Sequence, residues 1–182
     1  MRNLFRRICK FPFLPKLSVP VVLLLVLARC HSVPDIDFKH LILIDSSGKE
    51  LNFQSLGSSP ALVFFAASWC GSCRTELNLL KKNVAEMAGV RIIVLSDEYP
   101  ERIKVFRQSG SYPFEFHQLQ RPMKALGIYS IPVTYVLDEN MHTLKKQSGV
   151  IDWADRSTRT HYRKILGIDQ ESSLVNATKN SF

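Results

Sequence analysis

The sequence lacks the paired ligands of a structural metal site and the motifs of a nucleotide- or flavin-binding protein. Structural zinc needs four Cys or His ligands, usually in closely spaced pairs. The five histidines are scattered without a His-x(3–5)-His pair, and only one Cys-x-x-Cys pair is present. Zinc binding is therefore disfavoured, and we expect neither a metal nor any other bound cofactor.

Basic stripes interleaved with aromatic residues, which are typical of nucleic-acid-binding proteins, are missing after residue 31. The formal net charge of +8 comes mostly from residues 1–30, which carry six basic residues and no acidic one. The remainder has 18 basic residues against 16 acidic ones, a net charge of only +2. Nucleic acid is therefore not an expected partner. Internal repeats and low-complexity linkers are also absent, which favours a single folded domain.

The N-terminal apolar run is too short for a full transmembrane helix. Residues 17–28 form this run, which follows a basic stretch over residues 1–16. A helix needs roughly 20 apolar residues to cross the hydrocarbon of a bilayer. The charge asymmetry therefore favours a secretory signal peptide within residues 1–32, over a transmembrane helix or a buried helix of the fold.

The end of this leader resembles a bacterial lipobox, in which a cysteine becomes the lipidated first residue of the mature protein. Leu27 and Ala28 match that pattern and make Cys30 the candidate for lipidation, but Arg29 stands where the pattern has a small residue. Cleavage after Ala28 or Ser32 is the alternative, and an uncleaved leader would form a short membrane anchor. By one of these routes we expect an exported protein, associated with the membrane through its N-terminus, in the periplasm or cell envelope.

Two of the four cysteines fall in the leader, which leaves Cys70 and Cys73 for the folded domain. A disulfide stabilises a protein mainly by closing a long loop, so a pair three residues apart has little value as a structural staple. With zinc disfavoured, redox chemistry is the remaining interpretation of this Cys-x-x-Cys spacing.

Hydrophobic patterning over residues 35–168 predicts an α/β domain with a mixed central sheet and helices on both faces. The expected strands are an N-terminal hairpin over 41–53, buried strands at 61–66 and 91–95, a short edge strand at 114–117 and a second hairpin over 133–147. The expected helices cover 70–88, 100–108, 122–126 and 153–166. Residues 169–182 are polar, and we expect them to form a mobile tail.

The cysteine pair lies where a predicted buried strand meets a predicted helix. A helix N-terminus offers unpaired N–H groups and a partial positive charge, which stabilise the nucleophilic thiolate. We expect Cys70 to cap or begin the helix in an exposed position and Cys73 to face the core. Cys70 would then attack a client disulfide, and Cys73 would resolve the mixed disulfide. Trp69 either gives substrates an apolar surface beside the pair or simply packs at the strand end.

Residues 69–73, Trp-Cys-Gly-Ser-Cys, resemble the thioredoxin active site. Their surroundings are similar to the TlpA/ResA-type branch, whose members are membrane-tethered thiol–disulfide reductases of the bacterial periplasm or cell surface and include the cytochrome c maturation thioredoxins. The matching segments occur in the same order here: Asp45–Lys49, Phe65–Cys70, Arg74-x-Glu76 and Gly127–Asp138. The resemblance covers about residues 37–166 and implies a thioredoxin-like fold with an added N-terminal β-hairpin.

The resemblance also implies roles for residues outside the cysteine pair. Pro132 matches a cis-proline that faces the pair, and Ile131 would offer backbone hydrogen bonds to a substrate chain; from the sequence alone, Pro132 could equally begin a strand. Glu76 matches a functional acid of ResA-like proteins that could accept the proton of Cys73. The alternative for Glu76 is the preference of first helical turns for acidic residues. Thr134 is expected to pack or pair within its strand.

Three positions depart from the patterns of these relatives. Thioredoxin has a buried Asp six residues before its first cysteine, and Phe64 stands there in this chain, which increases the importance of Glu76. The dipeptide between the cysteines lacks the proline common in strong reductants. Val133 follows Pro132 where cytochrome-maturation members often have Glu, which weakens that particular assignment.

The leading hypothesis is an envelope reductase for cysteine-containing exported proteins, with apocytochrome c as one candidate client. It would need electrons from a membrane partner, because an oxidising compartment would otherwise leave the pair oxidised. The alternatives are an oxidant or isomerase of the same fold, a redox-inactive module for copper or peptide handling, and a peroxide-reducing relative. Copper delivery would favour Met-rich or Cys-x-x-x-Cys spacing, and peroxide reduction a lone cysteine; neither feature is found after the leader.

Overall fold

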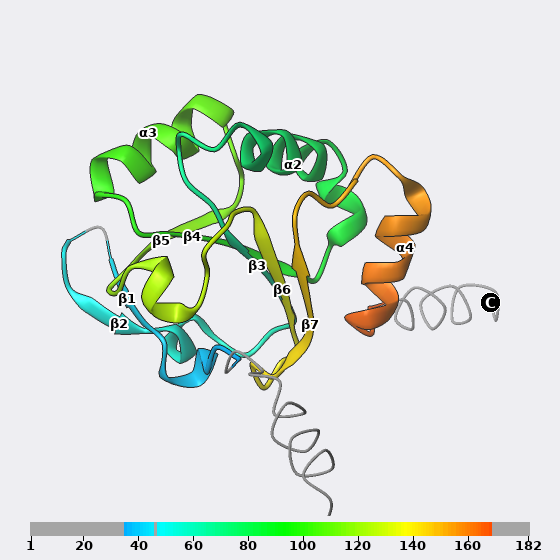
Figure 1. The fold of residues 1–182 in the computed structure, drawn as a ribbon. Helices are drawn as coiled ribbons and strands as arrows, with labels where there is room; N and C mark the ends of the chain where they lie inside the picture. The colour runs from blue at the N-terminus through cyan, green and yellow to red at the C-terminus, as the bar shows by residue number, and fades with distance from the viewer. Residues whose placement is uncertain (1–34, 46, 169–182) are drawn as a thin grey trace, which may run out of the picture. The chain divides into compact units, whose positions relative to one another are not determined.

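The domain is built on one seven-stranded mixed sheet, in the order β2-β1-β5-β4-β3-β6-β7 (Figure 1). The computed structural model describes residues 35–45 and 47–168. The predicted signal peptide, Cys30 and the predicted tail lie outside these residues, so those assignments stay predictions. The strands are β1 Ile42–Ile44, β2 Glu50–Asn52, β3 Ala61–Phe65, β4 Arg91–Ser96, β5 Glu115–Leu119, β6 Val133–Leu137 and β7 Thr143–Ser148.

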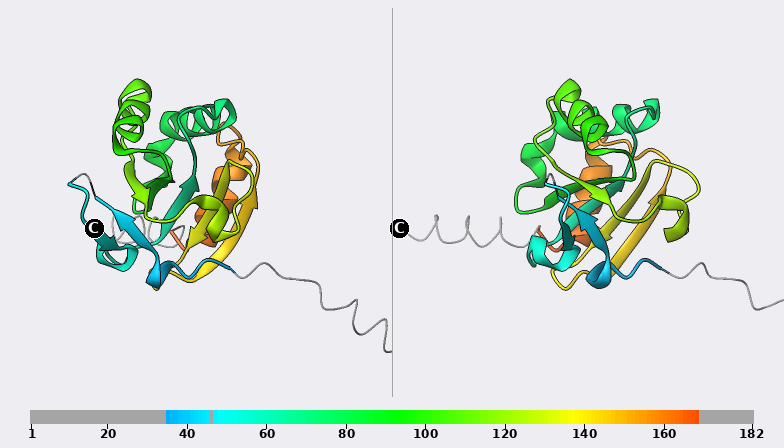
Figure 2. Two further views of the ribbon diagram at one scale, coloured as in Figure 1. Left: turned by 60° about the vertical axis from the view of Figure 1, so that its left-hand side comes forward. Right: turned by 90° about the vertical axis from the view of Figure 1, so that its left-hand side faces the viewer.

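The helices divide between the two faces of the sheet (Figures 1 and 2). The α-helices α2 (Gly71–Lys82), α3 (Pro100–Gly110) and α4 (Arg156–Ile165) and the 3₁₀ helix η3 (Val84–Met87) contribute to one buried apolar cluster. The 3₁₀ helices η1 (Phe38–His40), η2 (Phe53–Leu56) and η4 (Met123–Leu126) contribute to a second cluster on the other face. The predicted α/β class, with a mixed sheet, helices on both faces and an N-terminal hairpin, is confirmed.

The pairing of the central strands brings the predicted site residues together where β3 ends and β6 begins. β3, β4 and β5 are parallel, and β6 runs antiparallel to β3 with Phe65 opposite Val133. The segment that follows β3 therefore lies beside the segment that precedes β6. Every residue of β3 is buried, as expected for a strand covered on both faces.

β5 is an interior strand, so the predicted edge position is wrong. It pairs with β4 on one side and with β1 on the other, where Leu43 lies opposite Leu119. The N-terminal hairpin thus extends the sheet beyond β5. The pairing partners of such a short strand are set by tertiary contacts, which its own residues do not reveal.

The active-site helix is shorter than predicted. α2 ends at Lys82, and the 3₁₀ helix η3 follows it as far as Met87. The chain then changes direction at Gly89, whose φ is +86°. The side chain of Asn83 donates a hydrogen bond to the carbonyl of Leu79 at 2.9 Å. Asn side chains compete for backbone groups in this way and disfavour helix interiors, so the helix stops although its apolar pattern continues.

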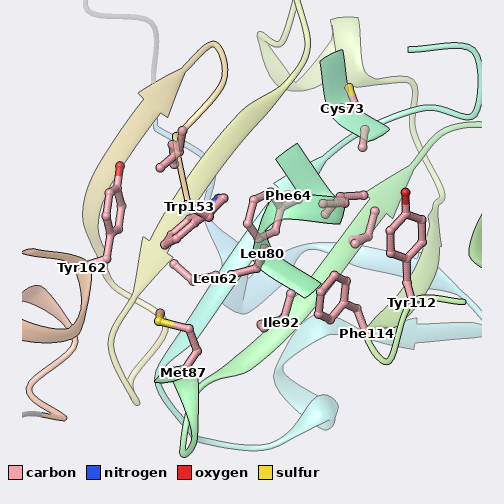
Figure 3. Close-up of a cluster of buried hydrophobic side chains, with 14 of the residues drawn as sticks. Leu62, Phe64, Cys73, Leu80, Met87, Ile92, Tyr112, Phe114, Trp153 and Tyr162 are labelled. Carbon is pink, nitrogen blue, oxygen red and sulfur yellow. The ribbon is translucent and has the colours of Figure 1, made fainter. Parts of the chain in front are cut away.

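The last helix also begins later than predicted, at Arg156. The Asp155 carboxylate caps it by accepting hydrogen bonds from the N–H groups of Ser157 and Thr158. Hydrogen bonds from the Ser157 hydroxyl and the Thr158 amide hold the pKa of Asp155 well below its usual range. Trp153 therefore lies in the loop before α4, fully buried and packed against the rings of Phe64 and Tyr162 (Figure 3).

Arg159 fixes the loop that carries Trp153. Its guanidinium donates to the carbonyls of Trp153 and Ala154, both at 2.8 Å, and to both carboxylate oxygens of Glu86 at 2.7 and 3.0 Å. Hydrogen bonding to Glu86 raises the pKa of Arg159, so the group stays charged. The indole of Trp153 is thereby held in a defined position beneath α2.

Candidate active site

Cys70 lies at the junction of β3 and α2 and caps the helix. Its Sγ accepts a hydrogen bond from the Cys73 amide at 3.1 Å and lies 3.3 Å from the hydroxyl of Ser72. The sulfur is thus at the positive end of the helix dipole, beside unpaired N–H groups. This arrangement stabilises a thiolate at Cys70.

Cys70 and Cys73 are joined by a disulfide, with 5.3 Å between their Cα atoms. The expectation that Cys70 is exposed is wrong for this oxidised state, because only 5% of the residue is accessible, against 1% for Cys73. In this structure the Cys70 sulfur lies over the first turn of α2, bonded to Cys73 and accepting a hydrogen bond from the Cys73 amide. The neighbouring Trp69 is 71% exposed, so it offers an aromatic surface beside the pair and does not pack at the strand end.

The segment before β6 faces the cysteine pair across the β3–β6 pairing. The Ile131–Pro132 peptide bond is cis, and Val133, the next residue, begins β6. The carbonyl of Pro132 accepts a hydrogen bond from Gly149 at 2.9 Å. No backbone hydrogen bond joins Ile131 to another of the described residues. The substrate-binding role that the resemblance implies for the backbone of Ile131 stays a prediction.

Glu76 is fully buried in the second turn of α2. Its Oε1 accepts hydrogen bonds from the Thr134 hydroxyl and the Trp153 indole N–H, each at 3.3 Å. Its Oε2 is buried without a hydrogen-bond partner among the described residues. Stabilisation of acidic residues by the helix dipole falls off within the first turn, so that preference does not account for a fully buried Glu76 in the second turn.

Burial raises the pKa of Glu76 to about 7, against the opposing effect of hydrogen bonds from Trp153, from Thr134 and from the backbone of Ile151. The Trp153 indole that contacts this carboxyl belongs to the buried apolar cluster of Phe64 and Leu80, which Figure 3 shows with Cys73 at one end. A group with this pKa can both accept and release a proton near neutral pH. Since Glu76 follows Cys73 by three residues on one helix, the two side chains share a face of α2.

Glu98 belongs to the site, although sequence reasoning missed it. This carboxylate accepts hydrogen bonds from the amide and the hydroxyl of Ser68, at 2.5 and 2.7 Å, and its side chain is only 8% exposed. Arg74 donates to the carbonyl of Ser68 from the other side. Both interactions fix the segment that leads into Cys70. Thirty residues separate Ser68 from Glu98, and no local pattern signals their contact.

Thr134 and Trp153 were also missed as partners of Glu76. Thr134 does pair within β6, as expected, but its side chain faces α2. The Ile-Pro-x-Thr pattern at 131–134 was the available signal for Thr134. Trp153 was placed in a helix, where its orientation toward Glu76 would not be expected.

The described residues offer no metal centre. Over residues 35–45 and 47–168, no three Cys, His, Asp or Glu side chains are arranged to hold a metal ion.

In the same part of the chain, every helix is too short or too polar to span a membrane.

Fold and site together define a thiol–disulfide oxidoreductase of the thioredoxin-like class. The chain belongs to the AhpC/TSA family, whose model matches residues 31–172. It is similar to the thioredoxin-like protein YneN of Bacillus subtilis (strain 168), with 25% identity over 115 residues. The match covers 60% of this chain and spans 65% of the length of YneN. The predicted thioredoxin-like membership is confirmed.

Solved structures share this fold at low sequence identity. StoA from Bacillus subtilis has 16% identity and a TM-score of 0.51, with 65% of this chain and 94% of StoA covered. A secreted Mycobacterium tuberculosis disulfide oxidoreductase homologous to E. coli DsbE has 15% identity and a TM-score of 0.52, with coverages of 68% and 96%. A thioredoxin-like protein from Porphyromonas gingivalis has 19% identity and a TM-score of 0.58, with coverages of 70% and 90%.

The raised pKa of Glu76 predicts a loss of stability with rising pH. Its ordinary value is 4.5 and its value in the folded protein is about 7, so the folded state binds more protons in this interval. This group therefore lowers the free energy of unfolding by about 2.5 kcal/mol between pH 5 and pH 8. Urea unfolding of the oxidised protein at both pH values measures the effect. Glu76→Gln should remove it, whereas Glu139→Gln, at an exposed turn, should not; equal pH dependence of all three proteins would contradict the assignment.

Removing one hydrogen bond to Glu76 should raise its pKa further, because each donor stabilises the carboxylate. We expect Thr134→Val to move the midpoint of the Glu76-dependent stability change upward by about 0.7 pH unit, the equivalent of about 1 kcal/mol. Thr143→Val, in β7, is the matched control. A midpoint that stays in place or moves downward in Thr134→Val would show that the hydroxyl does not act on Glu76.

Proposed function

We propose that this oxidoreductase works in the cell envelope as a reductase of disulfides in exported proteins. The observation that carries the proposal is the Cys70–Cys73 disulfide at the N-terminus of α2, with a buried carboxyl of pKa about 7 on the same helix. The first feature provides a nucleophile and a resolving thiol, and the second an acceptor for the proton of the resolving thiol. Peroxide reduction is less well supported, because each cysteine of the described domain is bonded to the other.

The proposed reaction begins with the reduced pair. The Cys70 thiolate attacks one sulfur of the client disulfide, and the other client sulfur leaves as a thiolate. Cys73 then gives its proton to Glu76 and attacks the Cys70 sulfur, which releases the second client thiolate. Two electrons pass from the pair to the client, and the protein ends in the disulfide form. Glu76 loses its proton to solvent before the next cycle.

The surroundings of the pair would bind the client as an extended chain. Trp69 offers an exposed aromatic surface, and the free backbone groups of Ile131 can form β-type hydrogen bonds beside Pro132. Such contacts depend little on sequence, which suits a protein acting on several cysteine-containing clients. Apocytochrome c is one candidate among them.

The location and the electron supply are further parts of the proposal. A signal peptide within residues 1–32, with lipidation at Cys30 or an uncleaved leader, would place the domain at the membrane. The structural relative from Mycobacterium tuberculosis is described as secreted, in agreement with an exported role. Because the envelope is oxidising, repeated turnover requires a membrane partner that reduces the Cys70–Cys73 disulfide.

Substitution of each cysteine separates their roles. Cys70→Ser should reduce insulin disulfides no faster than the uncatalysed background, because the attacking thiolate is absent. Cys73→Ser should accumulate a covalent mixed disulfide with its substrate, visible on non-reducing gels. Glu139→Gln, at an exposed turn, keeps both thiols and should retain activity. A Cys70→Ser protein as active as the wild type would exclude the proposed reaction.

Glu76→Gln tests the proton acceptor directly. At pH 7 we expect the resolution step, measured as release of the client thiol after rapid mixing, to slow by about 10²-fold. The first attack, by Cys70, should change little, because Glu76 is needed only when Cys73 loses its proton. Trp69 fluorescence can follow both phases. Unchanged resolution in Glu76→Gln would leave the carboxyl without a role in the reaction.

A further inference from the structure

A pocket of about 290 Å³ lies beside the cysteine pair and has no role in the reaction described above. Ser68 and Arg74, which flank the active-site segment, form one wall. The other wall consists of α3 residues: Glu101, Arg102, Val105, Phe106 and Ser109. In the chain, α3 follows β4 and Ile131 precedes β6. In the sheet, β4 and β6 lie on opposite sides of β3. A client chain that pairs with Ile131 and crosses Cys70 would therefore continue toward this pocket.

The pocket combines an apolar surface with an available cation. Val105 is 62% exposed, and the Arg74 guanidinium lies 6.0 Å from the centre of the Phe106 ring. The side chain of Arg102 is 68% exposed, and its only recorded partner among the described residues is Glu98, at 3.9 Å. A guanidinium has five N–H donors, so most of those of Arg102 are free to bind a carboxylate.

The pocket is built on the same contacts that fix the nucleophile. Glu98 holds Ser68 and lies near Arg102, and Arg74 donates to the Ser68 carbonyl. The wall formed by Ser68 and Arg74 is therefore in a fixed position relative to Cys70. A side chain bound here would set the position of the client disulfide along the site.

We propose that this pocket is a specificity subsite for an acidic side chain, preferably glutamate, close to the attacked cysteine of the client. The aliphatic stem of the glutamate would pack against Val105 and Phe106, and its carboxylate would bind Arg102. The lining holds Arg74 and Arg102 against Glu101. Glu98, the carboxylate nearest Arg102, is only 8% exposed and is engaged by Ser68, so the charge that the pocket presents to a client is positive. This inference rests on the proposed function, since it concerns how that site selects its clients.

The test compares disulfide-containing peptides of one sequence that differ only in Glu, Gln or Lys at positions up to three residues from the cysteine. The reduced full-length protein is mixed with an excess of each peptide, and the second-order rate constant of the single turnover is measured. At one of these positions the Glu peptide should react about threefold faster than the Gln peptide, the size expected of one partly exposed ion pair. The preference should shrink in high salt.

Variants of α3 identify the residue responsible. Arg102→Gln should abolish the preference for Glu, and Arg102→Glu should reverse it in favour of the Lys peptide. Lys104→Gln removes a charge from the same helix outside the pocket and should leave the preference intact. Because the result is a ratio between peptides, a general loss of activity in a variant does not affect it.

The outcomes separate this inference from the proposed function. Reduction of all peptides at equal rates, or a Glu preference that survives in Arg102→Gln, would overturn the subsite and leave the reductase intact. Failure to reduce even the Gln peptide would contradict the proposed function itself.

Discussion

The antiparallel pairing of β6 with β3 is the constraint on which the site depends. Phe65 opposite Val133 sets Pro132 beside the segment that leads to Cys70. Because side chains alternate along a strand, the same register turns Thr134 toward α2 and Val133 toward the opposite cluster. A slip of one residue would exchange these faces and bury a hydroxyl away from Glu76. The substrate-binding segment and the environment of the buried carboxyl are thus fixed together.

The buried carboxyl of Glu76 lowers the stability of the folded protein when it is charged. A carboxyl that is fully buried, with one oxygen unpaired, disfavours its charged form, and an apolar residue of similar size would avoid that cost. The hydrogen bonds from Thr134 and Trp153 at Oε1, together with the backbone of Ile151, reduce this cost in part. Local conflicts of this kind are expected at functional sites. In the proposed reaction, the burial of Glu76 keeps the pKa of its carboxyl near neutral pH, where it can accept the proton of Cys73.

The sequence predicted those parts of the molecule that depend on local pattern. Periodicity and turn residues depend on neighbours in the chain. They were sufficient to predict the buried strand in the apolar run at 61–66, the two hairpins and the helix that begins at the cysteine pair. It also led to the cysteines, Pro132 and Glu76 as candidates, through their spacing and through resemblance. The interior position of β5 depends on its pairing with the N-terminal hairpin, more than seventy residues earlier in the chain. The residues of β5 themselves do not indicate this pairing.

The contacts that complete the site join distant segments and could not be predicted in this way. Ser68 meets Glu98, and Glu76 meets Trp153, only through packing of separate elements. The start of α4 was placed at Trp153, three residues too early, whereas the cap formed by Asp155 sets it at Arg156. The exposure of Cys70 was misjudged because burial at the junction of β3 and α2 depends on how separate elements pack around it, which a local pattern does not encode.

The central claim is that the Cys70–Cys73 pair donates electrons to disulfides of exported proteins. The equilibrium reduction potential of this pair, measured with the purified protein in glutathione or dithiothreitol buffers, tests it most directly. We predict a value near or below about −220 mV, which would favour reduction of clients when a membrane donor is available. A value near about −120 mV would instead make the protein an oxidant. Failure to form the intramolecular disulfide at any buffer ratio would contradict the redox function altogether.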